Sequence, residues 1–484
     1  MPAPRPNILW IVTTQWRGQS CGFAGDANAR TPRLDAFAKR AVVFDQAFSN
    51  HPFGPFARAL LLSGRLSPAN GVRDYWDPLP RDTLTVAHHL GAAGYRTGFF
   101  GKWHLAPRDP LAPVVGEAHA RTLVPPQDRG GFEFWEGFEG GFLLNDPFLH
   151  GTTLPVPTCF PGYQSDVVCA RAAQWLQAQG AGRPGADAKA GADDSAHPRP
   201  SDAGPSELRA YAESGCAPAT GTNAEPSTAH SPRSTATAEP PTVHRPQSTA
   251  HRPWFAIVSL EAPHPPYGAA TPPHIPLRDP AALALAPNVP LGGTVEATAR
   301  RELAGYHRHI EATDQAIGRL LEQIDLATTA VFITSAHGDM HGAHGLFRKG
   351  WPYEEAIRVP LLACWPGGAP QRIHTPVSLA DLPATALALA GTAIPAQWPG
   401  ADLRLIAPDA EREVSLSMPS VAPFPQQCPQ TWTAVRTRDE IRVAGPDCLP
   451  WLRFDVRQDP WQQRNLAPTA DATGAPPPHC PPAM

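Results

Sequence analysis

Short apolar runs recur along the chain without alternation between apolar and polar residues. The first extends from Asn7 to Thr13 (NILWIVT), and another of the same kind extends from Trp254 to Leu260 (WFAIVSL). Further short runs lie at residues 96–100, 330–334 and 359–364. Runs of this length and composition are typical of strands that are buried on both faces of a parallel sheet.

The apolar positions between these runs follow a helical repeat. One set stands at positions i, i+3, i+4 and i+7: Ile317, Leu320, Leu321 and Ile324. This spacing predicts a helix with one apolar face. Alternating strands and helices predict an α/β fold, in which a doubly wound, mostly parallel sheet is sandwiched by helices. We expect the functional residues at the carboxyl ends of the strands, where such folds bind their ligands.

The composition changes along the chain and suggests how it is divided. Residues 179–251 are rich in Ala, Pro, Ser, Thr and Gly and have almost no large apolar side chains. Such a segment cannot bury enough surface to offset its ordering entropy, so we expect a disordered insertion. We assign residues 1–178 and 252–400 to one α/β domain. Residues 401–467 are predicted to form a small subdomain with an antiparallel strand pair, followed by a disordered tail at 468–484.

Composition and charge narrow the classes of partner. The chain has 484 residues, of which 42% are apolar, enough to fill the core of a large domain. Its 40 basic and 44 acidic residues give a formal net charge of -4, and no long block of like charge occurs. This balance argues against a nucleic-acid partner and against a membrane surface, so any attraction for a ligand must be local.

The sequence also indicates in which cellular compartment we expect the protein. The apolar run from Ile8 to Val12 is too short for a secretory core or a membrane span, and no basic region precedes it. We therefore expect a cytoplasmic protein. The eight cysteines show no CxxC pair and no framework spacing, which favours reduced thiols over disulfides.

Seven motifs in order along the chain resemble those of one enzyme family. They are PNILWIVTTQWRG, TPRLDAFAKRAVVF, ARALLLSGR, GYRTGFFGKWHL, EAPHPPY, ITSAHGDMHGAHGLFRKGWPYEEAIRVPLLACWPG and RQDPWQQRNLA. Together they resemble the sulfatase family of the alkaline phosphatase superfamily, with its arylsulfatase, choline-sulfatase and phosphonate monoester hydrolase branches. The resemblance covers roughly residues 6–178 and 252–467. It implies hydrolysis of a sulfate or phosphate-type ester by a divalent metal, usually calcium or manganese, with a formylglycine nucleophile made from cysteine or serine.

At the nucleophile position the resemblance fails. The family motif, anchored here on Arg58 and Gly64, places Gly54 where the family has its cysteine or serine. Residues 51–57 (HPFGPFA) contain no Cys, Ser or Thr, so a shift of register does not supply one. Glycine has no side chain to oxidise. We therefore expect no formylglycine.

At the metal positions the resemblance fails as well. Where the family has Asp followed by Asp or Gln after the first strand, this chain has Thr14 and Gln15. The later family motif Ser-Asp-His (or Asn)-Gly is here Ser-Ala-His-Gly, with Ala336 and His337 at its centre. Hard divalent cations need several oxygen ligands that carry negative charge. We therefore expect neither calcium nor manganese.

The cationic half of the family site is retained. The resemblance assigns substrate binding to five positions: Arg58, Lys102, His104, His264 and Lys349. We add His337 and Thr14, which are expected beside them at the ends of strands. If any activity remains, we expect His104, His264 and Lys102 to carry it. These residues predict a metal-free pocket that binds an anion, because their side chains would stabilise its negative charge.

Three functions remain open. The leading one is a sulfatase-fold pseudoenzyme that binds an anionic small molecule, of sulfate, phosphate or carboxylate type, or a protein partner. An alternative is a metal-independent transferase, lyase or hydrolase with a histidine base, in which Thr14 could replace the nucleophile. A lesser alternative is a working sulfuric or phosphoric ester hydrolase whose metal is recruited by Gln15, His337 and backbone carbonyls. The motif HGDMHGAHG, with His341 and His344, could also suggest zinc. The oligomeric state cannot be predicted.

Overall fold

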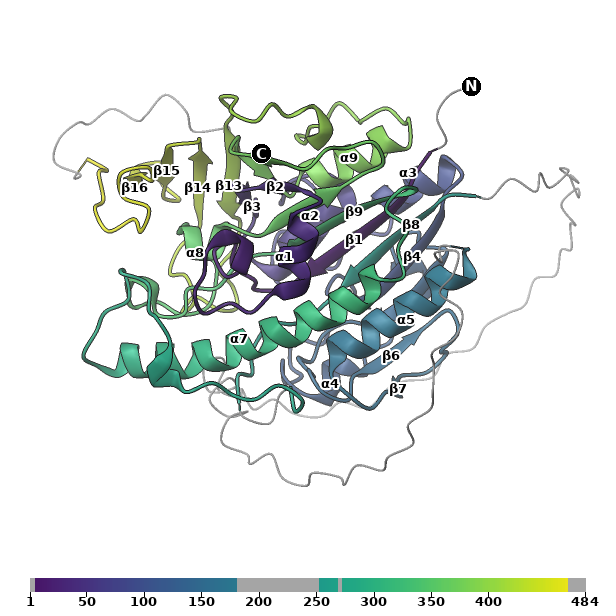
Figure 1. The fold of residues 1–484 in the computed structure, drawn as a ribbon, viewed down its shortest axis with the longest axis horizontal. Coiled ribbons are helices and arrows are strands. Elements are labelled where there is room, and N and C mark those ends of the chain that lie inside the picture. The colour runs from purple at the N-terminus through teal and green to yellow at the C-terminus, as the bar shows by residue number, and fades with distance from the viewer. Residues whose placement is uncertain (1–4, 181–251, 269–271, 469–484) are drawn as a thin grey trace, which may run out of the picture.

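The centre of the molecule is a large mixed sheet (Figure 1). The computed structural model describes residues 5–180, 252–268 and 272–468. The strands of the large sheet are β1 (Asn7–Thr13), β2 (Val42–Phe44), β4 (Arg96–Lys102), β5 (Phe134–Phe138), β6 (Phe148–Gly151), β7 (Thr158–Cys159), β8 (Trp254–Ser259), β9 (Thr329–Ser335), β10 (Leu361–Cys364) and β11 (Gln371–Ile373). Their order is β11-β2-β10-β9-β1-β8-β4-β5-β6-β7. A two-stranded sheet pairs β3 (Ala47–Phe48) with β12 (Val377–Ser378).

The middle of the large sheet is parallel. Strands β9, β1, β8, β4 and β5 run in one direction, and Val12 of β1 stands opposite Ser259 of β8 and Thr334 of β9. The apolar runs of the sequence form these strands, so the predicted fold class is confirmed. The strand predicted at 359–364 is present as β10, but it runs antiparallel to β9. The carboxyl ends of β1, β4, β8 and β9 therefore meet at one edge.

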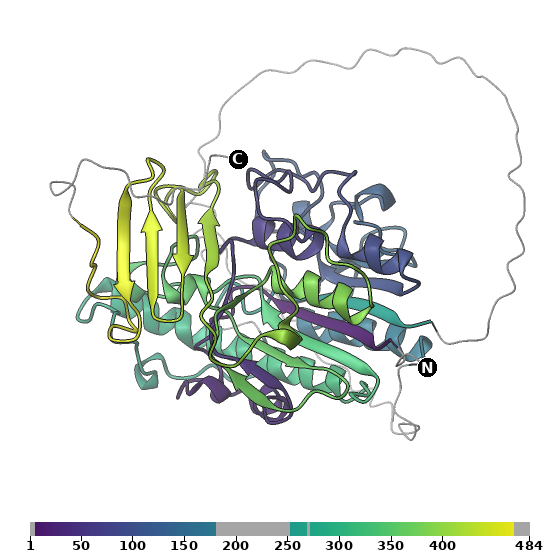
Figure 2. The ribbon, with the colours of Figure 1, turned by 90° about the horizontal axis from the view of Figure 1, so that it is seen from above.

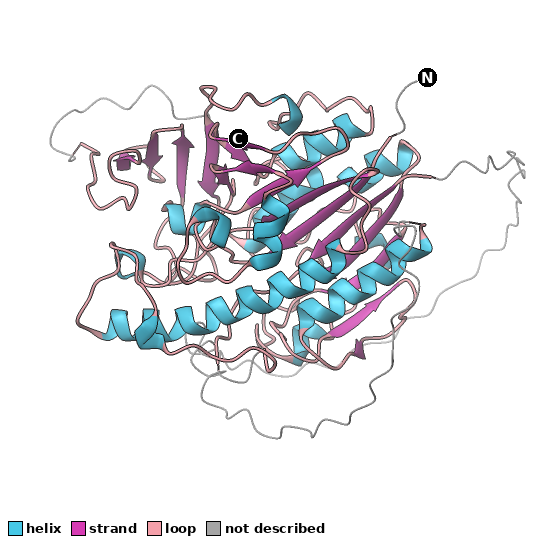
Figure 3. Cartoon of the chain, viewed as in Figure 1, coloured by secondary structure: helices cyan, strands magenta, loops and turns pink. Residues whose placement is uncertain are grey.

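Helices cover both faces of the sheet (Figure 3). The α-helices are α1 (Pro32–Ala38), α2 (Gly54–Ser63), α3 (Val86–Ala92), α4 (Glu117–Ala120), α5 (Gln164–Ala178), α7 (Thr294–Leu321), α8 (Glu354–Ile357) and α9 (Asp381–Leu389). The residues Leu9 and Ile11 of β1 pack in the core on the side of α1, α5 and α7, whereas Trp10 and Val12 pack in the core under α2, α3 and α9. Burial on both faces explains why the run does not alternate.

A small antiparallel sheet stands beside the main one (Figure 2). Its strands, in spatial order, are β13 (Val414–Met418), β14 (Trp432–Arg436), β15 (Glu440–Ala444) and β16 (Pro450–Asp455). The predicted strand pair is β14 and β15, and two further strands flank it. The indole of Trp432 donates a hydrogen bond to the carbonyl of Gly350 at 2.8 Å, which ties this sheet to the loop after β9.

Several other sequence predictions meet the structure only in part. The predicted disorder at 179–251 and 468–484 lies almost wholly outside the described residues, and the domain boundaries stay predictions. Five of the described cysteines are free thiols. Cys448 is disulfide-bonded, so the expectation of reduced thiols is wrong at that position. No helix in the described part of the chain is long and apolar enough to cross a membrane.

Candidate functional site

A pocket lies at the edge where the carboxyl ends of the parallel strands meet. Its lining residues are Thr14, Phe53, Gly54, Tyr75, Lys102, His104, Phe142, His264, His337, Lys349, Phe424 and Gln427. Six of the seven predicted substrate-binding residues are among them. The seventh, Arg58, is not a lining residue, but it donates a hydrogen bond to the lining residue Thr14. The structure therefore brings the predicted residues together, and their roles stay predictions.

Gly54 is the first residue of α2, and its missing side chain would point into the site. A Cβ atom built on Gly54 would lie 3.1 Å from His104 Nδ1 and 3.5 Å from Arg58 Nη1. The two nitrogens therefore converge on the space beside the Gly54 Cα. A side chain at residue 54 would point toward these two nitrogens, and glycine leaves this space without one.

Arg58 is a buried cation without a carboxylate partner in the part of the chain that the structure describes. Its Nη2 donates a hydrogen bond to Thr14 Oγ1 at 2.8 Å, and Thr14 donates in turn to the carbonyl of Leu260 at 2.9 Å. Its Nε and Nη1 have no hydrogen-bond partner among the described residues. Burial lowers the pKa of Arg58 to about 10, so the guanidinium stays charged at neutral pH.

Lys102 is paired instead with a carboxylate that the sequence analysis missed. Its ammonium forms an ion pair with Glu261, and both side chains are at most 1% exposed. The ammonium also lies 4.8 Å from the centre of the Phe142 ring. Burial lowers the pKa of Lys102 to about 8, against the attraction of Glu261. Lys102 is therefore not the unpaired positive charge that the sequence suggested; the signal for this was Glu261 itself, an acidic residue immediately after an apolar strand.

Lys349 is held by neutral acceptors. Its Nζ donates to Gln15 Oε1 at 2.8 Å and lies 3.1 Å from His264 Nε2. The amide nitrogen of Gln15 donates to the carboxylate of Asp339. Burial lowers the pKa of Lys349 to about 7, so its charge changes close to neutral pH.

The three imidazoles of the pocket are neutral at neutral pH. Burial lowers the pKa of His104, His264 and His337 well below its ordinary value. His337 Nδ1 lies 2.8 Å from the carbonyl of Gly338 and donates to it, which leaves Nε2 with a lone pair and no partner among the described residues. His104 Nε2 lies 3.2 Å from the hydroxyl of Tyr75. These rings therefore add hydrogen-bonding groups to the pocket but no positive charge.

A second ion pair stands behind His104 and was also missed. Arg108 Nε lies 3.4 Å from Glu139 Oε1, and both side chains are almost fully buried. The guanidinium of Arg108 lies over the Tyr75 ring, 4.6 Å from its centre. Burial raises the pKa of Glu139 to about 8. Nothing in the sequence singles out these residues, because they come from separate loop positions.

The side chains at the metal positions of the family have other partners. Thr14 and both ends of the Gln15 amide are hydrogen-bonded as described above, and Ala336 has no side-chain donor atom. Across residues 5–180, 252–268 and 272–468 no group of three or more His, Cys, Asp and Glu side chains could hold a metal. The histidines of HGDMHGAHG do not gather: His341 lies against Tyr306, with ring centres 4.3 Å apart, and His344 stacks on Tyr353 at 4.1 Å.

Comparisons with known proteins agree with this fold. The sequence model of the Sulfatase family matches residues 6–185 and 241–392. The ulvan-active sulfatase of Formosa agariphila is 30% identical over 96% of this chain and 77% of its own length. The structure of the Bacteroides fragilis protein yidJ covers 96% of this chain and 92% of its own, with 21% identity and a TM-score of 0.73. The structure of BT4656 with its substrate D-glucosamine-2-N,6-O-disulfate covers 96% of this chain and 93% of its own, with 18% identity and a TM-score of 0.68.

Proposed function

The chain belongs to the sulfatase family, and we propose that within it this protein binds a small oxyanion, of sulfate, phosphate or carboxylate type, without hydrolysing an ester. The proposal concerns the pocket between Gly54, Arg58 and His104. Sulfatase relatives bind anionic, sulfated substrates, as the solved complex with D-glucosamine-2-N,6-O-disulfate illustrates.

The observation that carries the proposal is the unsatisfied guanidinium of Arg58. A buried donor without a partner costs about 1–3 kcal/mol, and more when it is charged. Two of the three guanidinium nitrogens of Arg58, Nε and Nη1, have no hydrogen-bond partner among the described residues. Of these, Nη1 faces the space beside Gly54. An oxygen of a bound anion in that space would accept a hydrogen bond from Nη1 and neutralise the charge.

His104 supports the same ligand. When the Tyr75 hydroxyl donates to His104 Nε2, the ring carries its proton on Nδ1, the nitrogen that faces Gly54. Nδ1 then donates to the same anion as Arg58. His337 contributes differently, because its Nε2 is an acceptor and suits a hydroxyl or protonated oxygen of the ligand.

The absence of hydrolysis follows from what the pocket lacks. In the family the nucleophile comes from an oxidised side chain, and Gly54 has none. The hydroxyl of Thr14 is bonded to Arg58 and Leu260, so it is not held by a base that could activate it. We infer that neither formylglycine nor a substitute nucleophile operates at this pocket.

The residues present do not fit the divalent metal of the family. Calcium or manganese would need several oxygen ligands with negative charge among them. Gln15 Oε1 already accepts from the Lys349 ammonium, whose charge would repel a second cation. The carboxylates of Asp339 and Glu261 are bonded to Gln15 and Lys102. We derive no step through a metal.

Calorimetry tests the proposed function. We expect sulfate, phosphate and phenyl sulfate to bind to the full chain in the presence of excess chelator. The Arg58→Gln variant should bind at least about tenfold more weakly, a loss of about 1.4 kcal/mol. Arg65→Gln, at an exposed position just after α2, is the matched control and should bind like the wild type. Failure of all three anions to bind, or equal binding by Arg58→Gln, would overturn the proposal.

A second candidate function is metal-independent catalysis, and one observation favours it. The contact between Lys349 Nζ and His264 Nε2 joins two groups that can exchange a proton, and burial lowers the pKa of Lys349 to about 7. General acids and bases work best with a pKa near the operating pH. Turnover of nitrophenyl sulfate, phosphate or acetate in excess chelator, lost in His264→Gln but kept in the exposed His274→Gln, would favour this function over binding alone.

A further inference from the structure

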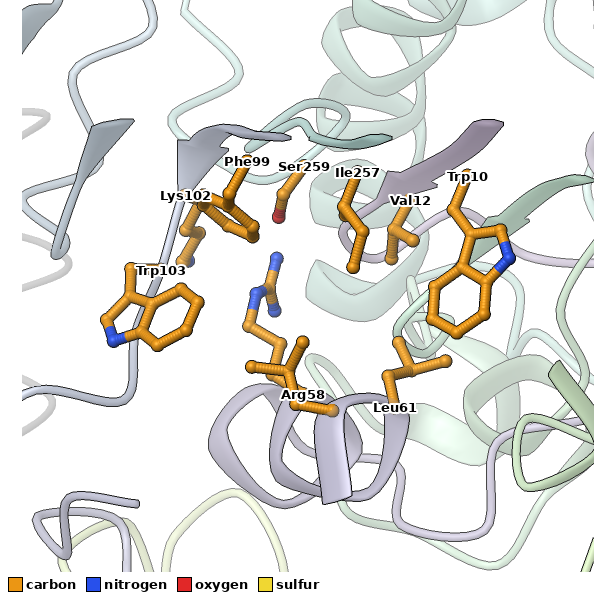
Figure 4. A pocket seen from close by; sticks show the side chains of 10 residues that line it. Trp10, Val12, Arg58, Leu61, Phe99, Lys102, Trp103, Ile257 and Ser259 are labelled. Carbon is orange, nitrogen blue, oxygen red and sulfur yellow. The ribbon is translucent and has the colours of Figure 1, made fainter. Parts of the chain in front are cut away.

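A second hollow lies between α2 and the sheet (Figure 4), and it shares Lys102 with the anion pocket. Its lining residues are Trp10, Val12, Arg58, Leu61, Leu62, Phe99, Lys102, Trp103, Ile257 and Ser259. Seven of these ten side chains are apolar. Figure 4 shows the guanidinium of Arg58 rising from α2 into this hollow, with its tip toward the hydroxyl of Ser259. The hollow is thus an apolar space with a polar end.

Among the described residues, the charge of Arg58 at the polar end has no carboxylate within ion-pair distance, although Glu261 and Glu139 act on it from farther away. Lys102 also lines the hollow, but Glu261 neutralises it. Arg58 is 4% exposed, and its Nε has no hydrogen-bond partner among the described residues. In surroundings of low polarity an unpaired cation attracts an anion far more strongly than it does in water. A neutral water molecule could accept from Nε but would leave the charge unbalanced.

The apolar side chains that line the hollow favour some anions over others. A tetrahedral oxyanion is strongly hydrated and would exchange its water shell for only a few donors here, those of Arg58, Lys102 and the Ser259 hydroxyl. Unpaired oxygens against indole and aliphatic walls would be costly. A halide is a single atom with weaker hydration, so it loses less on entry and tolerates apolar neighbours.

We propose that this hollow binds a chloride ion, held by the guanidinium of Arg58 and the hydroxyl of Ser259 among apolar walls. Apart from Lys102, the hollow and the oxyanion pocket have different lining residues, but they share the guanidinium of Arg58, so chloride and an oxyanion would compete for one charge. The inference does not rest on the proposed function. A chloride ion in the hollow would accept a hydrogen bond from the Arg58 guanidinium and so fix the position of this side chain.

Anomalous diffraction with bromide in place of chloride tests the proposal. Crystals of the full chain grown in sodium bromide should show a bromine peak in the hollow, within hydrogen-bond distance of the Arg58 guanidinium and of Ser259 Oγ. In solution, the line width of ³⁵Cl resonances should report chloride binding that weakens several-fold in Ser259→Ala. A hollow that contains only water, or chloride binding that is equal in Ser259→Ala, would overturn the proposal.

A conservative variant separates this site from the oxyanion pocket. Val12→Ile adds one methylene group to the wall of the hollow and keeps the β-branched side chain that suits a strand. It should reduce chloride binding and leave sulfate binding, measured without chloride, unchanged. Ile11→Leu, on the opposite face of β1, is the volume-matched control and should change neither. Bromide that persists at full occupancy in Val12→Ile contradicts the site, whereas a wild-type chain that holds bromide in the hollow but binds no sulfate contradicts only the proposed function.

Discussion

Lys349 Nζ donates a hydrogen bond of 2.8 Å to Gln15 Oε1, so a side-chain ammonium takes up the oxygen that a family member could offer to a metal. The contact is buried, and the carboxylate of Asp339 accepts from the other end of the same amide. The ammonium of Lys349 thus lies among the residues at the family's metal positions. Its charge, unlike that of calcium or manganese, depends on pH.

The first prediction concerns metals. Because Gln15 is already bonded to Lys349 and Ala336 offers no donor atom, calcium, manganese and chelators should all leave the midpoint of thermal unfolding unchanged. Metal analysis of the purified full chain should find far less than one equivalent of any divalent ion. Near-stoichiometric metal that raises the unfolding midpoint would favour the working ester hydrolase instead.

The second prediction concerns the pH dependence of stability through Lys349. Its pKa is about 7 in the folded chain and 10.5 as a free side chain, so between these values the unfolded chain binds more protons. The free energy of unfolding of the wild type should therefore rise, relative to Lys349→Met, by about 2 kcal/mol between pH 7 and pH 9. Below pH 7 both states are protonated and the difference should level off. Denaturant titrations at several pH values measure it, and a difference that stays constant over this range would contradict the neutral-acceptor environment of Lys349.

The third prediction concerns the space beside Gly54. A serine at this position would place its Cβ 3.1 Å from His104 Nδ1 and fill the space assigned to the ligand. Gly54→Ser should therefore bind sulfate at least about tenfold more weakly, as measured by calorimetry, and should not hydrolyse sulfate esters. The control is Gly91→Ser, where an added Cβ meets nothing within 4 Å. Tighter sulfate binding by Gly54→Ser would show that the ligand lies elsewhere.

The fourth prediction concerns the buried ion pair of Lys102 and Glu261. Removing the carboxylate in Glu261→Gln leaves a buried ammonium unpaired, which should destabilise the fold by about 3–5 kcal/mol. The double variant Lys102→Met with Glu261→Gln removes both charges and should recover most of that loss. Chemical denaturation measures both, and equal stabilities for the single variant and the wild type would mean that the pair does not form.

The sequence predicted the framework of the site better than its electrostatics. Apolar runs located β1, β4, β8 and β9 because strands buried on both faces leave a local signature, and the family motifs then placed residues such as Lys102 at the ends of these strands. The direction of β10 was not predictable, because it depends on the connection and not on the local pattern. Likewise the neutralisation of Lys102 by Glu261 joins residues far apart in the chain, and the low pKa of His337 arises from burial that only packing creates.

The most direct test of the account is a crystal structure of the full chain with sulfate and calcium both present. We expect a sulfate ion beside Gly54, with one oxygen within hydrogen-bond distance of Arg58 Nη1, and no calcium near Gln15 or His337. A calcium ion coordinated by Gln15 and His337, or a pocket without sulfate, would contradict it.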